Sequence, residues 1–205
     1  MLFDDEYQTI VSEARGSFRD KGSKFTGIAV PVQTELEVKQ FLEKVRKEYF
    51  DATHHCYAYI LGPDKAAWRE NDDGEPSGTA GRPIRGAILS ADLTNILIII
   101  IRYYGGTKLG VAGLINAYKT TAKETLDNAV IIAKKVHESF EIRFRYEQMN
   151  DVMRIIKETK TDIISTDFGE NCFIHCSIRK NDAVLFSEKI SQLIKVQIKE
   201  AGLIL

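Results

Sequence analysis

The sequence lacks the features that mark extracellular or strongly basic proteins. Only three of its 205 residues are cysteine, at positions 56, 172 and 176. An odd, small number of cysteines does not build a disulfide framework and is typical of a reducing compartment, so we expect a cytoplasmic protein. The formal net charge is -1. Nucleic-acid binding would therefore have to rest on a local basic patch, because the chain as a whole is not basic.

Long apolar runs are also missing. The longest is Ile96 to Ile101, whereas a helix needs about 20 residues to cross a bilayer. The N-terminal stretch MLFDDEYQTI is acidic and has neither the basic nor the apolar part of a signal peptide. We therefore expect no export and no membrane partner.

The first two thirds of the chain have the patterns of a mixed α+β domain. Alternating and β-rich segments predict strands over residues 10–18, 25–32, 53–61 and 95–104. Helical periodicity predicts helices over residues 34–49, 84–93 and 111–129. The strand over 95–104 is apolar without interruption, so we expect both of its faces to be covered.

Residues from 135 onward follow a different order. The pattern predicts strands over residues 140–146, 163–168, 172–178 and 196–205. It also predicts one helix from Met149 and another capped by Asp182. The resulting order, βαββαβ, is that of the ferredoxin-like unit. We therefore predict the α+β class and two domains, residues 1–134 and 135–205.

The stretch RYYGGTKLG, Arg102 to Gly110, is the first candidate site. Glycines at 105, 106 and 110 stand between a buried strand and a helix start, where free amides can form an anion-binding concavity. Lys108 adds a charge, Thr107 a hydroxyl, and Arg102 a guanidinium suited to phosphate. The spacing excludes both the P-loop and the G-x-G-x-x-G fingerprint. The alternative is that the glycines only make a tight turn.

Positive charge is concentrated around this turn. Between positions 82 and 123 there are one acid, Asp92, and six cations: Arg82, Arg85, Arg102, Lys108, Lys119 and Lys123. This stretch therefore has an excess of five positive charges. Basic side chains between tyrosines are what single-stranded RNA contact requires, through phosphate pairing and base stacking. Tyr103 and Tyr104 point to opposite faces of a strand, so only one, Tyr104, is assigned to the site. The alternative is a solvated basic surface.

Two groups of histidine and cysteine resemble ligand sets. On the strand over 53–61, His54 shares a face with Cys56, which we expect to be the core side, while His55 shares the other face with Tyr57. We expect that second face to be an open surface on which His55 and Tyr57 could stack bases. Further along, Cys172 and Cys176 are predicted to be core thiols and His175 a surface imidazole. Because no converging ligand spacing is present, we predict no metal site and no cofactor.

The segment DDGEPSGTAGRP, Asp72 to Pro83, is a loop by composition. Its acids, Asp72, Asp73 and Glu75, could bind Mg²⁺ or act as general bases. The preferred interpretation is that they pair with neighbouring cations, for example Glu75 with Arg82 or Arg102. The supporting part of this loop is completed by Ser77, Gly78 and Thr79. Nothing in the sequence couples either hydroxyl to a histidine.

The pair His54-His55, then DDGEPSGTAGRP, then RYYGGTKLG, in this order, resemble the IMPACT (YigZ-like) family. The resemblance implies an N-terminal α/β sandwich like the second domain of a small-subunit ribosomal protein. It also implies a C-terminal domain similar to a ferredoxin-like domain of elongation factor G. The resemblance further implies a link of the eukaryotic relatives to translational control through a partner of a stress kinase, and binding of nucleic acid or the ribosome by the bacterial members.

Three classes of function remain open at this point. The leading hypothesis is a non-enzymatic, translation-associated regulator that binds RNA or the ribosome through the basic glycine turn. The second is an enzyme or nucleotide-binding protein that holds a phosphorylated metabolite between the acidic loop and the turn. The third is a protein-interaction regulator of a stress-response kinase pathway, as the eukaryotic relatives suggest.

Overall fold

The computed structural model describes residues 5–169 and 171–204, so the parts of the predictions that fall on 1–4, Glu170 and Leu205 lie outside it. The chain divides into two compact units. The N-terminal unit is Tyr7–Ala133, and the C-terminal unit begins at Lys134 and includes Asp5 and Glu6.

Asp5 and Glu6 are a correction to the predicted boundary, which assigned them to the first domain. The Asp5 carbonyl accepts a hydrogen bond from the Val136 amide at 2.7 Å. Both carboxylates form ion pairs with Arg179. These long-range pairings have no signature in the local sequence.

The N-terminal unit is built on an antiparallel sheet of five strands in the order β2-β3-β6-β4-β5. The strands are β2 (Ala14–Asp20), β3 (Ser23–Pro31), β4 (His54–Leu61), β5 (Ala67–Asn71) and β6 (Ile96–Tyr103). The helices are α1 (Glu35–Glu48), α2 (Gly81–Ser90) and α3 (Gly110–Asp127). A separate two-stranded sheet pairs β1 (Glu6–Ile10) with β7 (Ile131–Lys135).

Four of these strands differ from the prediction. The strand predicted over 10–18 is divided between β1 and β2, and both β5 and β7 are absent from the prediction. The sequence of β5, AWREN, is half polar because the strand lies at a sheet edge with exposed side chains. An edge strand of this kind does not produce the apolar pattern of a covered one.

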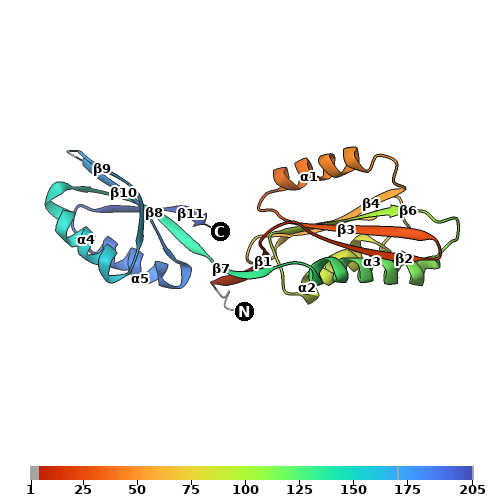
Figure 1. Cartoon of the computed structure of the whole chain (residues 1–205). Helices are drawn as coiled ribbons and strands as arrows, with labels where there is room; N and C mark the ends of the chain where they lie inside the picture. Colours follow the sequence, from red (N-terminus) through yellow and green to blue (C-terminus); the bar gives the residue numbers. More distant parts are fainter. Residues whose placement is uncertain (1–4, 170, 205) are drawn as a thin grey trace. The chain divides into compact units, whose positions relative to one another are not determined.

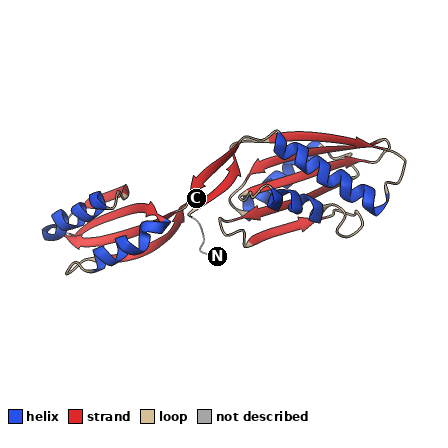
Figure 2. Cartoon of the chain, turned by 90° about the horizontal axis from the view of Figure 1, so that it is seen from below, coloured by secondary structure: helices blue, strands red, loops and turns tan. Residues whose placement is uncertain are grey.

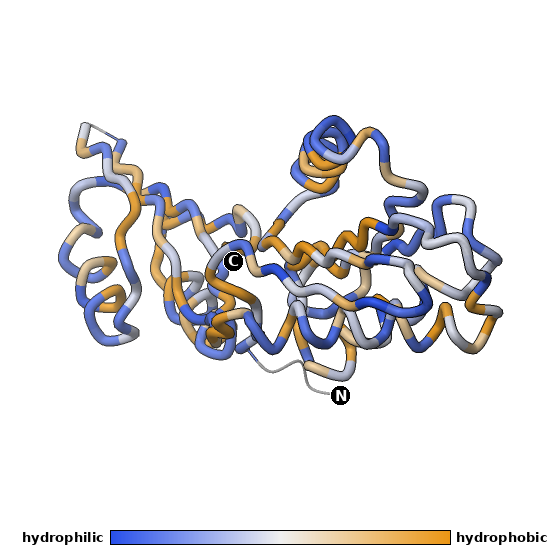
Figure 3. Tube along the Cα trace, turned by 45° about the vertical axis from the view of Figure 1, so that its right-hand side comes forward, coloured by the Kyte–Doolittle hydropathy of each residue, from blue (hydrophilic) through white to orange (hydrophobic). Residues whose placement is uncertain are grey.

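Helices cover both faces of the five-stranded sheet. α1 lies on one face, and α2 and α3 lie on the other (Figure 1). Every residue of β6 from Ile96 to Arg102 is buried, which confirms the prediction that this strand is covered on both sides. The hydrophobic side of α1 faces the sheet (Figure 3). This helix begins at Thr34, whose hydroxyl accepts a hydrogen bond from the Glu37 amide at 3.2 Å, as the capping-box spacing predicts.

α3 packs closely on the sheet because Gly27 has no side chain. A Cβ at this position would lie 2.1 Å from Oγ1 of Thr125 in α3. The helix axis could not be this near β3 if residue 27 carried any side chain.

The C-terminal unit has the predicted order βαββαβ. Its elements are β8 (His137–Arg145), a short 3₁₀ turn (Tyr146–Gln148), α4 (Met149–Glu158), β9 (Asp162–Phe168), β10 (Asn171–Arg179), α5 (Lys180–Ser191) and β11 (Gln197–Ile204). The strands form an antiparallel sheet in the order β11-β8-β10-β9. Both helices lie on the same face of this sheet (Figures 1 and 2).

The core of the C-terminal unit lies between that face and the two helices. Cys172 and Cys176 are buried in this core, as predicted. The expected cap at Asp182 is wrong: α5 begins two residues earlier, Arg179 occupies the capping position, and Asp182 lies in the first turn. No helix in the described part of the chain has both the length and the apolar character needed to cross a membrane.

Candidate functional site

The segment Tyr104–Leu109, which we call the glycine loop, connects β6 to α3 and is exposed from Tyr104 to Lys108. Its first two amides are bonded to the protein: Tyr104 N–H donates to Thr53 Oγ1 at 3.1 Å, and Gly105 N–H donates to Ser23 Oγ at 3.2 Å. Within the described residues, no hydrogen bond joins the amides of Gly106, Thr107 or Lys108 to another protein group. The loop is thus fixed at its start and presents free donors at its tip.

The turn between β2 and β3 packs against the glycine loop. A Cβ on Gly105 would lie 1.9 Å from the carbonyl carbon of Gly22, so only glycine permits this contact. Lys21 and Lys24, on either side of Gly22, are exposed, and Lys24 pairs in register with Tyr103 of β6. These two lysines were missed by the sequence reasoning, because about 80 residues separate them from the loop and only the β3–β6 pairing brings them together.

Arg102 lies beneath the glycine loop and not on the surface. Its residue is 5% exposed, and Nη1 lies 2.5 Å from Oε1 of Glu75 in a buried ion pair. Nη2 donates to Ser23 Oγ at 3.3 Å, and the guanidinium lies 5.5 Å from the centre of the Tyr104 ring. The predicted pairing of Glu75 with Arg102 is confirmed. The guanidinium is therefore committed to the protein's own groups, because the covered strand β6 carries it into the interior.

A buried polar network surrounds this ion pair. The Tyr118 hydroxyl donates to Glu75 Oε1 at 2.8 Å, and the Cys56 sulfur lies 3.3 Å from that hydroxyl. Cys56 also lies 3.0 Å from the Asp72 carbonyl oxygen. Burial is the main cause that raises the pKa of both the Cys56 thiol and the Tyr118 phenol, so both stay protonated. A thiol in this state is a poor nucleophile and acts as a core hydrogen-bonding group.

The segment Asn71–Ala80, which we call the acidic loop, uses its first carboxylate to hold its own backbone. Oδ1 of Asp72 accepts hydrogen bonds from the amides of Ala80 and Gly81 at 2.9 and 2.8 Å. Oδ2 accepts one from the Gly78 amide at 2.8 Å. Asp72 therefore fixes the far side of the loop and the first residue of α2.

The second carboxylate of the acidic loop is used in the same way. Oδ2 of Asp73 accepts from the His55 amide at 2.7 Å, and Oδ1 accepts from Arg46 at 3.2 Å. His54 Nδ1 donates to the Asp73 carbonyl at 2.8 Å, which ties the end of β4 to the loop. Among the described residues, no group of three or more His, Cys, Asp or Glu side chains is arranged to hold a metal ion.

The two hydroxyls of the acidic loop differ in environment. Thr79 is buried and its hydroxyl donates to the Pro76 carbonyl at 2.6 Å, whereas Ser77 is exposed. Neither forms a hydrogen bond with a histidine in the described ranges. The hydroxyl–histidine pairing required for a serine-type nucleophile is therefore not formed here.

The prediction that His55 and Tyr57 lie on an open sheet surface is wrong. They are 8% and 7% exposed and belong to the layer covered by α1. His55 Nε2 donates to the Tyr49 carbonyl at 2.9 Å. The alternation of the strand was interpreted correctly, but both faces are core, because α1 packs on the side that was expected to be free.

The predicted cations are not equivalent. Arg85 pairs with Glu70 at 2.5 Å and stacks 3.8 Å from the centre of the Trp68 ring, and Lys123 pairs with Asp127 at 2.7 Å. Of the six predicted cations, those that are exposed and without an ion pair in the described structure are Arg82, Lys108 and Lys119. The basic region is thus smaller than the sequence count suggests.

Comparisons with known proteins agree with this architecture. A family model described as the Impact N-terminal domain matches residues 21–126. The IMPACT family member YvyE of Bacillus subtilis (strain 168) is 32% identical over 84% of this chain and 80% of its own length. The IMPACT family member YigZ of Escherichia coli (strain K12) is 28% identical over 83% of this chain and 85% of its own.

The likeness extends to a solved structure and to eukaryotic proteins. A crystal structure of a hypothetical protein, 25% identical, superposes with a TM-score of 0.72 over 95% of this chain and 96% of that one. The Homo sapiens protein named IMPACT is 33% identical over 44% of this chain and 29% of its own length. The bacterial relatives match over both units of the fold, and the chain belongs to the IMPACT family.

Proposed function

We propose that the N-terminal unit binds RNA, in translation-associated complexes, through the glycine loop and the neighbouring β2–β3 turn. The observation that carries this proposal is the exposed tip of the loop. There, three consecutive amides, from Gly106 to Lys108, donate no hydrogen bond to another group of the described residues. Exposed backbone donors next to cations form a site for a phosphate oxygen.

The charges beside these amides support a polyanionic ligand. Lys108 stands within the loop, and Lys21 and Lys24 are brought beside it by the packing of Gly22 on Gly105. Together they place three cations at one end of the sheet, where the neighbouring acids are Asp20 and Asp51. An extended phosphate backbone fits several such charges better than a single small anion does.

Tyr104 adds a surface for a base. Its residue is 47% exposed, and the buried guanidinium of Arg102 lies near its ring. Base stacking on an exposed aromatic ring is tolerant of sequence. Phosphate contacts together with one stacking platform suit single-stranded RNA with little sequence preference.

The acidic loop supports a binding role over a catalytic one. Asp72 and Asp73 accept hydrogen bonds from backbone amides, and Glu75 is held by Arg102 and Tyr118. These carboxylates form hydrogen bonds that stabilise the fold, so none of them is positioned as a free general base. The family's implied role in translation and its implied likeness to a ribosomal-protein domain are consistent with RNA as the ligand.

The proposal can be tested by fluorescence anisotropy with a short labelled single-stranded RNA at low salt. Lys21→Ser combined with Lys108→Ser removes two cations beside the free amides. For two lost phosphate contacts, the slope of log affinity against log salt concentration should become less steep by about 1.4, and affinity should fall about tenfold.

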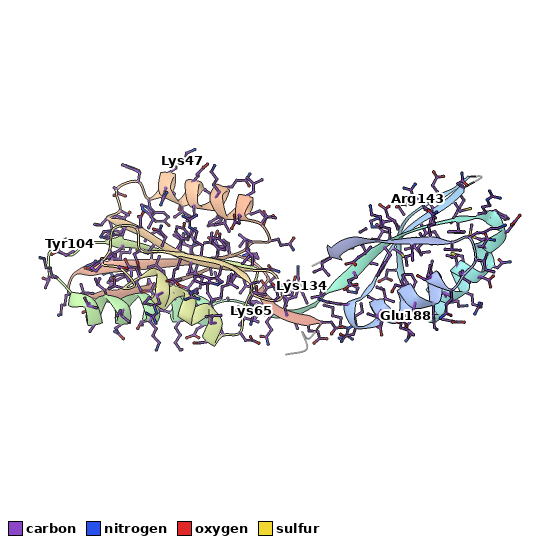
Figure 4. The ribbon with its side chains drawn as sticks, turned by 180° about the vertical axis from the view of Figure 1, so that it is seen from behind. Lys47, Lys65, Tyr104, Lys134, Arg143 and Glu188 are labelled. Atoms are coloured by element: carbon purple, nitrogen blue, oxygen red, sulfur yellow. The ribbon has the colours of Figure 1, made fainter. Side chains whose placement is uncertain are left out.

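Lys44→Ser with Lys47→Ser is the matched control. It removes the same charge from α1, on the opposite side of the sheet from α3, and Figure 4 labels Lys47 on this helix and Tyr104 at the loop. Equal binding by wild type and the Lys21/Lys108 variant would disprove the proposal. Ribosome co-sedimentation of the same variants would then test the translation-associated part separately.

A further inference from the structure

One face of the sheet in the C-terminal unit is not covered by its helices. The residues that face α4 and α5, such as Phe140, Ile142 and Ile174, form the core. Their neighbours along the strands point to the opposite face, which is open. Figure 4 labels Arg143 on the sheet side of this unit and Glu188 on α5.

The register of the strands defines the middle of this open face. Arg143 of β8 pairs with Phe173 of β10 on one side and with Gln197 of β11 on the other. Phe173 in turn pairs with Asp167 of β9. The Arg143 guanidinium lies 5.5 Å from the centre of the Phe173 ring. A cation and an aromatic ring thus occupy the two central strands side by side.

The edge of the sheet at the Arg145 end is basic and grooved, and the groove extends from the open face to the core residues Phe144 and Val196. A groove of about 630 Å³ is lined by Phe144, Asn171, Val196 and Gln197 together with Arg143, Arg145 and Lys195. Among the described residues, this lining includes three cations and no carboxylate. A second groove of about 700 Å³ shares Arg143 and extends along β11 to Lys199, where Glu141 is its one acid.

Arg143 is available for a ligand. Its side chain is 68% exposed, and its contact with Glu141 is at the 4.0 Å limit of an ion pair. Of the carboxylates on the face, Glu141 and Asp162 lie toward the end away from Arg145, whereas Asp167 pairs in register with Phe173. The charge of the described lining is therefore complementary to an anion, because none of these residues is an acid.

We propose that this open face, centred on Arg143, Arg145 and Phe173, is a second contact surface for single-stranded RNA. The proposal rests on RNA binding as the proposed function of the chain, whichever of the two surfaces contributes to it. Four-stranded βαββαβ sheets are suited to this ligand because aromatic side chains on the two central strands can stack bases while cations hold the phosphates.

The composition of the face favours RNA over a protein partner. Apart from Phe173, its centre is formed by Arg143, Gln197, Asp167 and His175, which are polar or charged. Protein interfaces usually centre on clusters of buried apolar anchors, and such a cluster is not formed by these residues.

Two variants of the full-length chain separate the charge from the stacking contribution. Arg143→Ser with Arg145→Ser should weaken RNA binding about tenfold and reduce the salt slope by about 1.4. Phe173→Leu should weaken binding by a similar factor with the salt slope unchanged, because stacking releases no counterions. The matched control, Lys157→Ser with Lys160→Ser, removes two exposed charges on the helix side and should bind like wild type.

The outcomes distinguish this surface from the glycine loop. If Lys21→Ser with Lys108→Ser weakens binding and the Arg143/Arg145 variant does not, only the second surface is disproved. If the reverse holds, the glycine loop is disproved and the sheet face stands. Absence of RNA binding by the wild type at low salt overturns both, and binding of an acidic peptide in place of RNA overturns the choice of ligand. Ultraviolet crosslinking with peptide mapping should place a crosslink on the segment that contains Phe173.

Discussion

The acidic loop and the glycine loop meet at the same end of one sheet, yet they use their polar groups in opposite ways. The carboxylates of the acidic loop accept hydrogen bonds from the protein's own amides and cations. The tip of the glycine loop has three amides without a partner in the described structure. The buried pair of Arg102 and Glu75 joins the acidic loop to the end of β6, from which the glycine loop starts.

This difference distinguishes a loop that stabilises the fold from a loop that can bind a ligand. Both segments are rich in glycine and charge, so composition alone gives them equal claim to a ligand. The hydrogen bonds show that the carboxylates of the acidic loop are engaged within the protein, and the proposal therefore assigns the ligand to the glycine loop. Variants of the acidic loop should therefore lower the free energy of unfolding, and variants of the tip of the glycine loop should lower the affinity for RNA.

The largest effect is expected at Arg102. Arg102→Met leaves the Glu75 carboxylate buried without its cation and should lower the free energy of unfolding by about 3–5 kcal/mol. The double variant Arg102→Met with Glu75→Gln should recover part of this loss, because no charge is left unpaired. Urea unfolding followed by fluorescence of Trp68, the single tryptophan, measures both. A loss below about 1 kcal/mol for the single variant would show that the pair does not hold the loops.

A smaller loss is expected when the acidic loop loses its internal acceptor. Asp72→Ala removes the group that receives hydrogen bonds from Gly78, Ala80 and Gly81, and should cost about 2–3 kcal/mol. Asp72→Asn retains one acceptor oxygen and should cost less. The same urea titration compares them. If neither substitution changed the free energy of unfolding, the acidic loop would have to be held by other contacts.

The buried thiol behind the acidic loop predicts a loss of stability at alkaline pH. Burial raises the pKa of Cys56 above its unfolded value of about 8.5, so its contribution is complete below about pH 8.5 and is lost as pH rises toward the folded pKa. Between these limits the free energy of unfolding should fall by up to about 1.4 kcal/mol per pH unit. Cys56→Ala should remove this dependence.

Cys176 provides an internal control for that experiment. Burial raises its pKa to about 12 as well, but it lies in the C-terminal unit. Trp68 lies in the N-terminal unit, so its fluorescence should respond to Cys56→Ala and not to Cys176→Ala. An equal response to both variants would mean that the two units unfold together.

The smallest effect on stability is expected at the tip of the glycine loop. Lys108 is exposed, and Lys108→Ser should change the free energy of unfolding by less than about 0.5 kcal/mol while weakening RNA binding. Gly106→Ala meets no atom within 4 Å, so only its φ of 85° opposes it, at about 1 kcal/mol. A destabilisation by Lys108→Ser as large as that of Asp72→Ala would show that the tip of the glycine loop stabilises the fold as much as the acidic loop does.

Much of the fold was predictable because it depends on local patterns. The apolar run from Ile96 to Ile101 indicated a strand with two covered faces, and the periodicities after residue 135 gave the βαββαβ order. The pairing of Glu75 with Arg102 was also foreseen, because an acid near several cations orients them. The edge strand β5 was missed because its exposed side chains produce no apolar pattern.

The sequence by itself determined the helices, the strands with an apolar pattern, the apolar central strand and the family motifs, because each depends on residues that are neighbours in the chain. Only the tertiary structure decided which groups a ligand could reach. The packing of α1 buries His55 and Tyr57, and the β3–β6 register brings Lys21 and Lys24 beside the glycine loop. Exposure depends on which distant segments cover a residue, and neither composition nor spacing encodes that covering.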